Sequence, residues 1–197
     1  LTLGLVTQMA SASVITLEKG TRSIQGVNIA KSATLTMGNT PSTKLDLVGA
    51  GLRTKHVVIT DVKVYVTQIF LDNVGKFVRT NEGAVASLEG MQAGAIRLTF
   101  LRDVDAQTVQ TSFKEAFKKN AVNMESAGVQ NFLSAVSDGA DAQKGRSMNI
   151  SLSKSADGTT SVVYENTEGD ETTITGDANL FKAIFSIWLG EPADSGL

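Results

Sequence analysis

The sequence contains no cysteine and only one histidine, His56. The absence of thiols excludes disulfides, thiolate nucleophiles, zinc–thiolate sites and iron–sulfur clusters. One imidazole can act as a lone ligand or base, but a metal site built from several histidines is excluded. His56 directly precedes an apolar segment, where an isolated histidine is more often structural than functional, so we assign it no chemistry.

The chain also lacks a strong charge of one sign. Its 18 Lys and Arg residues and 20 Asp and Glu residues give a formal net charge of −2, so no basic field is available to hold a nucleic acid. Hydrophobic residues make up 42% of the chain and charged residues 19%, which excludes a disordered chain, a coiled coil and a protein with several membrane spans. The acidic residues lack the spacing of a calcium loop, so no metal site is predicted.

The N-terminal segment is predicted to be the remnant of a secretory signal. Leu1–Ala12 is apolar and ends in the small-residue triplet Ala10-Ser11-Ala12, which is typical of the end of such a signal. We therefore expect a periplasmic or secreted bacterial protein whose mature chain begins near Ser13; the alternative is an ordinary N-terminal strand. No other apolar run approaches the ~18 residues of a transmembrane segment. Residues 13–197 are of a size to fold as a single domain.

A β-hairpin is predicted around the Thr60-Asp61 pair. Residues 57–59 are apolar and lead into this turn, and in residues 62–67 valine alternates with Lys63, Tyr65 and Thr67, the period of a strand. The preceding Gly49-Ala50-Gly51 lacks the lysine and the glycine spacing of a P-loop and is followed by a strand. We expect these glycines to form a tight turn that presents the Arg53 guanidinium to a cleft.

The remaining periodicities predict strands and helices in separate blocks. Strands are expected at residues 44–48, 95–101, 148–153, 160–166 and 171–175. Helices are expected at residues 84–88, at residues 125–136, after the N-cap Asp105, and after the N-cap Asp177 with an end at Gly190. Because neighbouring strands form hairpins, with Asp157-Gly158 marking one turn, the fold class is α+β with a largely antiparallel sheet.

Arg53 and Tyr65 are the polar residues to which we assign a binding role. They are twelve residues apart on the two arms of the predicted hairpin, so both could face one cavity. A guanidinium and a phenol together suit a carboxylate or an enolate. The alternatives are a solvated arginine and a tyrosine packed at a sheet edge. Phe113, Phe117 and Trp188 lie on apolar helix faces that would form the walls of such a cavity.

Three segments resemble a known family. They are GAGLRTK with KVYVTQIFL, RLTFLRDV, and IFSIWLGEP, at residues 49–55 with 63–71, 97–104 and 184–192. Together they resemble the chalcone isomerase fold family, in particular its exported bacterial chalcone isomerase-like members, over about residues 44–190. The resemblance implies an open-faced β-sandwich, in which a large curved antiparallel sheet carries a helical layer and a ligand cleft opens between them.

The resemblance also implies roles for single positions. In the plant enzymes, which close a chalcone to a flavanone, an arginine in the glycine motif holds the substrate oxyanion and corresponds to Arg53. The other four catalytic positions hold different residues in this chain. One threonine of the enzymes corresponds to Tyr65, the tyrosine to Thr108 or Val109, the asparagine to Glu115 or Ala116, and the second threonine to Ile187. The fatty-acid-binding branch of the family pairs the arginine with a tyrosine to hold a carboxylate. The ligand-binding residues are then Arg53, Tyr65, Phe113, Phe117, Ile187 and Trp188.

We therefore expect an exported, non-enzymatic protein that binds an apolar small molecule, a fatty acid or a similar carboxylate, without a cofactor. Three alternatives stay open. One is an isomerase or lyase with Tyr65, Glu115 or Lys55 as acid or base. The second is a haem or tetrapyrrole carrier with His56 or Tyr65 as axial ligand. The third is a protein-interaction module with a collapsed cleft.

Overall fold

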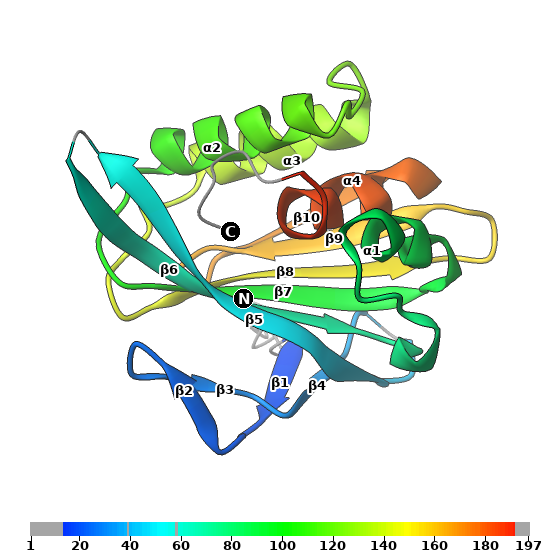
Figure 1. The fold of residues 1–197 in the computed structure, drawn as a ribbon. Coiled ribbons are helices and arrows are strands. Elements are labelled where there is room, and N and C mark those ends of the chain that lie inside the picture. Colours follow the sequence, from blue (N-terminus) through cyan, green and yellow to red (C-terminus); the bar gives the residue numbers. More distant parts are fainter. Residues whose placement is uncertain (1–13, 39, 58, 192–197) are drawn as a thin grey trace, which may run out of the picture.

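The computed structural model describes residues 14–38, 40–57 and 59–191 (Figure 1). The predicted signal segment Leu1–Ala12 and Ser13 lie outside the described residues. The strands are β1 (Ile15–Glu18), β2 (Arg22–Ile24), β3 (Val27–Ile29), β4 (Ser32–Leu35), β5 (Thr43–Val57), β6 (Thr60–Leu71), β7 (Ala93–Phe100), β8 (Ser147–Lys154), β9 (Thr160–Glu165) and β10 (Glu171–Gly176). The helices are α1 (Asn81–Ser87), α2 (Ala106–Lys119), α3 (Ala127–Asp138) and α4 (Ala178–Leu189), with short 3-10 turns at Val74–Lys76 and Leu88–Gly90.

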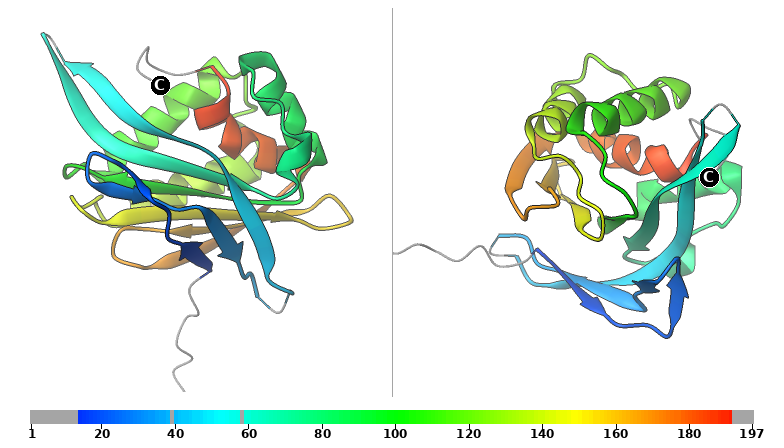
Figure 2. Two further views of the ribbon diagram at one scale, coloured as in Figure 1. Left: turned by 60° about the horizontal axis from the view of Figure 1, so that its bottom comes forward. Right: turned by 90° about the vertical axis from the view of Figure 1, so that its left-hand side faces the viewer.

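Within the described residues, eight strands form one sheet in the order β1-β4-β5-β6-β7-β8-β9-β10, and β2 and β3 pair as a separate hairpin. Every pair of neighbouring strands is antiparallel. The helices lie over one face of this curved sheet, and the N-terminal strands lie on the other side (Figures 1 and 2). The predicted α+β fold, a large curved antiparallel sheet covered by a helical layer, is confirmed.

Two helices begin where their sequences predict. Asp105 caps α2, and its Oδ1 accepts a hydrogen bond at 2.8 Å from the amide three residues later. Asp177 caps α4, and its Oδ1 accepts a hydrogen bond at 2.9 Å from the amide two residues later. Each cap pairs a backbone N–H group that the first helical turn leaves without an internal partner. None of the helices in the described part of the chain is long and apolar enough to cross a membrane.

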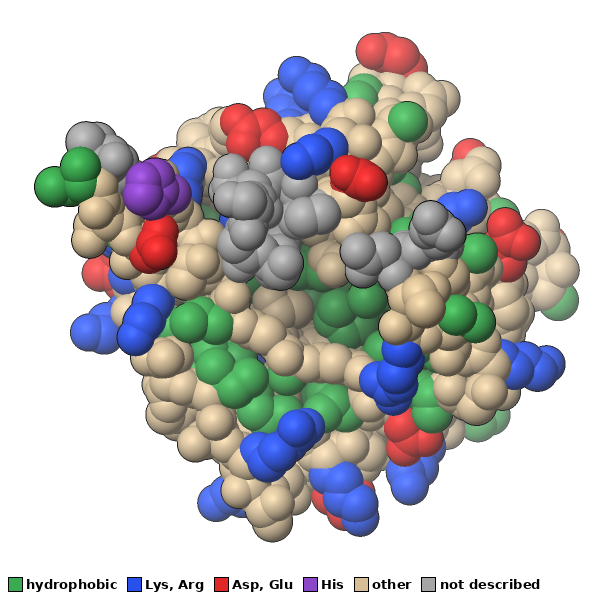
Figure 3. Space-filling view, in the orientation of Figure 1, with side chains coloured by type: hydrophobic (Ala, Val, Ile, Leu, Met, Phe, Trp, Pro, Cys, Tyr) green, Lys and Arg blue, Asp and Glu red, His purple; other side chains and the backbone are tan. Residues whose placement is uncertain are grey.

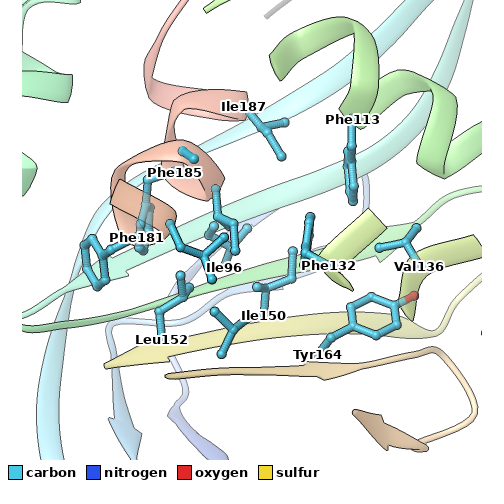
Figure 4. Close-up of a cluster of buried hydrophobic side chains, with 14 of the residues drawn as sticks. Ile96, Phe113, Phe132, Val136, Ile150, Leu152, Tyr164, Phe181, Phe185 and Ile187 are labelled. Carbon is cyan, nitrogen blue, oxygen red and sulfur yellow. The ribbon is translucent and has the colours of Figure 1, made fainter. Parts of the chain in front are cut away.

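Aromatic side chains join the helical layer to the sheet. The ring centroid of Phe132 on α3 lies 5.9 Å from that of Phe113 and 6.2 Å from that of Phe117, both on α2, and 6.3 Å from that of Tyr164 on β9. Phe132 is completely buried among the apolar side chains that Figure 4 shows. This contact between two helices and a strand holds the helices on the sheet, because buried aromatic area contributes strongly to stability.

The sheet curls so that β1 and β4, together with the hairpin of β2 and β3, cover its second face (Figures 1 and 2), and no element was predicted in this part of the chain. A second apolar cluster lies beneath them and includes the buried Leu45, Phe70 and Ala95. Gln68 of β6 is also buried there, and its Oε1 accepts a hydrogen bond from the Ala30 amide at 2.7 Å. Strands of three or four residues are too short to show a clear period, so their sequences gave no signal.

Candidate functional site

Arg53 and Tyr65 lie directly opposite each other on β5 and β6, in the hairpin whose end projects beyond the rest of the sheet (Figure 2). The Arg53 side chain is only 6% exposed, and Tyr65 is half-buried. Both line a cavity of about 260 Å³ between this hairpin and the start of α2. The structure therefore brings together the two residues that the sequence placed on opposite arms of one hairpin.

A β-bulge in β6 decides which side chains face the cavity. The register shifts by one residue after the Arg53–Tyr65 pair, which leaves Val64 as the extra residue. Val64 and Tyr65 both line the cavity although they are adjacent in the sequence. Val66 instead pairs with Thr99, on the face that the N-terminal strands cover. The strict alternation predicted for residues 62–67 is therefore wrong, because a bulge interrupts the two-residue period.

Gly49 and Gly51 lie inside β5, so the tight turn predicted before Arg53 is wrong. The strand continues because β5 pairs with β4 along its first part and with β6 along almost its whole length. A Cβ atom added to either glycine would meet no atom within 4 Å. Because residues two apart in a strand share a face, the glycines leave open space on the same face as Arg53.

Aromatic side chains connect the cavity to the core. The Tyr65 ring packs edge-on against Phe100, with 5.6 Å between centroids. The Tyr65 hydroxyl accepts a hydrogen bond at 3.3 Å from Nε1 of the half-buried Trp188 on α4. The Trp188 ring also lies 5.4 Å from that of Phe113, which lines the cavity. Tyr65 is therefore held in place by groups from both the sheet and the helical layer.

Three cationic side chains line the cavity. Arg53 is buried, whereas Lys55 and Arg102 are exposed and lie nearer to the solvent. A buried guanidinium with two exposed cations near the entrance attracts an anion, because a charge in a partly desolvated cleft is weakly screened.

The two acidic residues of the cavity are already engaged by other parts of the chain. Oδ1 of Asp103 accepts a hydrogen bond from the Lys144 amide at 2.7 Å. Asp105 caps α2, and hydrogen bonds from the Thr108 hydroxyl and amide hold the pKa of the Asp105 carboxyl below its usual value. A carboxylate with a lowered pKa is a weak base, so Asp105 is poorly suited to abstract a proton from a ligand.

The other predicted site residues lie at different depths. Phe113 lines the cavity. Phe117 and Ile187 are 0% and 4% exposed in the core and are not among the described residues that line it. Trp188 contacts the cavity through Tyr65 and Phe113. Contact of these side chains with a ligand stays a prediction.

Arg102 and Val104 line the cavity, although neither was predicted to be a site residue. Both follow the end of β7, in the segment RLTFLRDV that carries the family resemblance. A signal was available for Arg102, because a polar residue directly after a buried strand commonly lies at a sheet end, where ligand sites form.

His56 lies near the end of the projecting hairpin (purple in Figure 3). Its side chain is 68% exposed, and its Nδ1 lies 2.9 Å from Oδ1 of Asp61. It does not line the cavity of Arg53 and Tyr65, so the imidazole is poorly placed to ligate a haem there. In the described part of the chain, no three histidine, cysteine, aspartate or glutamate side chains gather to hold a metal ion.

Comparison with solved structures finds this fold in a fatty-acid binding protein of Arabidopsis thaliana. The TM-score is 0.60 at 19% sequence identity, over 90% of this chain and 92% of that chain. At this identity the likeness shows the fold alone. A comparison with curated proteins finds no match. The sequence model of the chalcone isomerase-like family matches residues 21–197, and because this match spans most of the sequence, the chain belongs to the chalcone isomerase-like family.

Proposed function

We propose that this chain binds an apolar small molecule with an acid group, of the fatty-acid class, and does not transform it. The observation that carries the proposal is the buried Arg53 paired across two strands with Tyr65 at one wall of the cavity. A guanidinium can hold a carboxylate by two parallel hydrogen bonds, and a phenol hydroxyl adds a third. Small-ligand sites commonly combine a few such anchors with apolar walls.

The walls and the volume of the cavity indicate the size of the ligand. Apolar side chains of the hairpin, of β7, of α2 and of the segment between β7 and α2 face the cavity, namely Val62, Val64, Phe100, Val104, Val109 and Phe113. The volume of about 260 Å³ is slightly below the ~300–1,000 Å³ of common small-molecule sites. A short or medium acyl chain therefore suits this cavity better than a long one, and decanoic acid is a suitable first probe.

The comparison supports the same ligand class. The structure from Arabidopsis thaliana that shares this fold is described as a fatty-acid binding protein. Because the identity is only 19%, this support is weaker than the support from the cavity itself, and the arginine must be tested directly.

Replacing Arg53 with methionine is expected to weaken the binding of decanoate by about one to two orders of magnitude. The variant loses charge-assisted hydrogen bonds in a partly desolvated site, which contribute about 1.5–3 kcal/mol. Methionine keeps the apolar stem of the side chain, so the packing around β5 is retained. Tyr65→Phe removes one neutral donor and is expected to weaken binding about tenfold or less. Isothermal titration calorimetry measures both effects.

The controls separate recognition of the acid from other effects. Arg22→Met, on the exposed hairpin of β2 and β3, should leave the dissociation constant unchanged. The methyl ester of decanoic acid should bind the wild-type protein about as weakly as the acid binds Arg53→Met. If the acid and its ester bind equally well and Arg53→Met changes neither, Arg53 is structural and the proposal is wrong.

The isomerase reaction of the plant enzymes is not expected. The Thr108 hydroxyl donates to Oδ2 of Asp105 at 2.7 Å, and Ile187 carries no hydroxyl. Each missing donor in a preorganised site costs about 3–4 kcal/mol of transition-state stabilisation. The purified protein should therefore not convert a chalcone to a flavanone above the rate in solution, as followed by chalcone absorbance. Turnover that disappears in Arg53→Met would contradict this prediction.

A further inference from the structure

Two cationic side chains of the cavity have no partner within the described part of the chain. Lys55 and Arg102 both line the cavity of Arg53 and Tyr65, and both are exposed. Neither side chain makes a hydrogen bond or an ion pair with any other described residue. Exposed cations are common on protein surfaces, so the position of these two relative to Arg53 decides what they can do.

Lys55 and Arg102 lie further toward the end of the projecting hairpin than the Arg53–Tyr65 pair. Arg53 pairs with Tyr65, and Tyr65 pairs with Phe100, so these three residues form a row across β5, β6 and β7. Lys55 follows Arg53 by two residues on β5 and lies about 7 Å along the strand from this row. Arg102 follows Phe100 by two residues, just beyond the end of β7. Because β5 and β7 run in the same direction, both cations lie on the same, outer side of the row.

The carboxylates of the cavity do not pair with these two cations. Asp103 accepts a hydrogen bond from the Lys144 amide, and Asp105 caps α2. Neither carboxylate lies within ion-pair distance of Lys55 or Arg102. The outer part of the cavity therefore presents two cationic donors that an acidic group of a ligand can use.

We propose that the ligand carries two acidic groups and is a dicarboxylic acid of the fatty-acid class. This inference rests on the proposed function. Arg53 and Tyr65 hold one carboxylate in the inner part of the cavity, and Lys55 and Arg102 hold the second carboxylate near the solvent. The bulge residue Val64, which lines the cavity between Tyr65 and the outer part, contacts the methylene chain that joins the two carboxylates.

A second carboxylate distinguishes this cavity from one whose outer part is only apolar. An apolar end would reject a second carboxylate, because placing an unpaired charge there is far less favourable than placing a methyl group. Cationic donors at that end reverse the preference, because they form charge-assisted hydrogen bonds with the carboxylate. The affinity of a dicarboxylic acid relative to the monocarboxylic acid of the same length therefore reports on Lys55 and Arg102, whereas the dependence on Arg53 reports on the inner anchor.

The test is isothermal titration calorimetry with hexanedioic, octanedioic and decanedioic acids and with the monocarboxylic acids of the same three lengths. At one or two lengths the dicarboxylic acid is expected to bind the wild-type protein about tenfold more tightly than its monocarboxylic partner, the combined effect of two exposed ion pairs. The gain should depend on length, because the outer cations lie at a set distance from the Arg53 row. It should shrink in about 1 M salt, which screens exposed charges.

The double variant Lys55→Gln with Arg102→Gln should lose this gain. Its weaker positive field also lowers the affinity for the monocarboxylic acids, so the ratio of the two affinities is compared. The matched control is Lys63→Gln. Lys63 is an exposed lysine of the same hairpin, but its Nζ donates to Oε1 of Gln25 at 3.0 Å and it does not line the cavity. The control should keep the wild-type ratio, and because all three side chains are exposed, every variant should melt close to the wild-type temperature.

The outcomes distinguish this inference from the proposed function. If the monocarboxylic acids bind in an Arg53-dependent manner but no dicarboxylic acid exceeds its partner, the ligand has one acidic group, this inference is wrong and the proposed function stands. A gain that survives in the double variant, or that Lys63→Gln removes as well, has the same meaning. If no acid binds the wild-type protein, or if Arg53→Met changes the binding of none of them, the proposed function and this inference are both wrong.

Discussion

Phe132→Ala is expected to lower the free energy of unfolding by about 3–5 kcal/mol, the usual cost of truncating a buried phenylalanine. The ring is 0% exposed and contacts three other aromatic rings, on α2 and on β9. Its removal loses apolar burial and leaves a cavity that rigid neighbours cannot close. Because domains of this kind are stable by about 5–15 kcal/mol in total, this single change removes a large part of the stability.

Urea unfolding followed by circular dichroism measures the effect, and Phe132→Leu is the matched control. Leucine fills most of the space and should cost clearly less than alanine. Phe113 stacks on Phe132 and lines the cavity, so Phe132→Ala should also weaken decanoate binding. A loss below about 1 kcal/mol would mean that α2 and α3 close over the vacated space, contrary to the interlocked packing described above.

The second large effect is expected in alkali. Tyr164 is 1% exposed, and burial raises its pKa from 10.0 to about 12. In the unfolded chain the phenol ionises first, so the unfolded state holds fewer protons than the folded state between these values. Stability therefore falls as the pH rises above 10, by about 1.4 kcal/mol per pH unit from this group alone. The loss approaches about 2–3 kcal/mol near pH 12.

Tyr164→Phe isolates this contribution. Its hydroxyl has no hydrogen-bond partner in the described part of the chain, so phenylalanine should be as stable as tyrosine or more stable at neutral pH. The difference in unfolding free energy between the variant and the wild type should widen in favour of phenylalanine above pH 10. The chain has two tyrosines, so phenolate absorbance in Tyr65→Phe reports on Tyr164 alone. Equal alkaline losses in wild type and Tyr164→Phe would contradict the raised pKa.

Local chemistry explains what could be predicted from the sequence. Asp105 and Asp177 are short acceptor side chains directly before amphipathic segments, and a cap needs only neighbours within three residues. The hairpin followed from apolar residues on both sides of Thr60-Asp61, but its turn was predicted two residues too late, because Thr60 and Asp61 begin β6 and pair with Val57 and His56. The placement of Arg53 and Tyr65 on opposite arms could be predicted from this hairpin, but their direct pairing could not, because it depends on where the strands reverse and on the bulge at Val64.

The parts that could not be predicted depend on distant contacts. Whether Gly49 and Gly51 form a turn or continue a strand depends on β6, which pairs with both residues. The helix-face pattern placed Phe117 at the cavity, and the family resemblance placed Ile187 there; only the packing shows that both lie deeper in the core.

The bulge at Val64 has an evolutionary consequence. It is one residue inserted into one strand, and the pairing is regular from Gly49 to Arg53 on one side of it and from Thr54 to Val57 on the other. Loss of Val64 would restore the two-residue alternation, so Val62 and Lys55 would still face the cavity. The cavity wall would lose one side chain and the hairpin the extra twist that a bulge gives, while the pairing of β6 with β7 stayed intact. A single insertion or deletion can therefore change the ligand preference of a member of this family in one step, at a place where alignments of its strands would show only a gap.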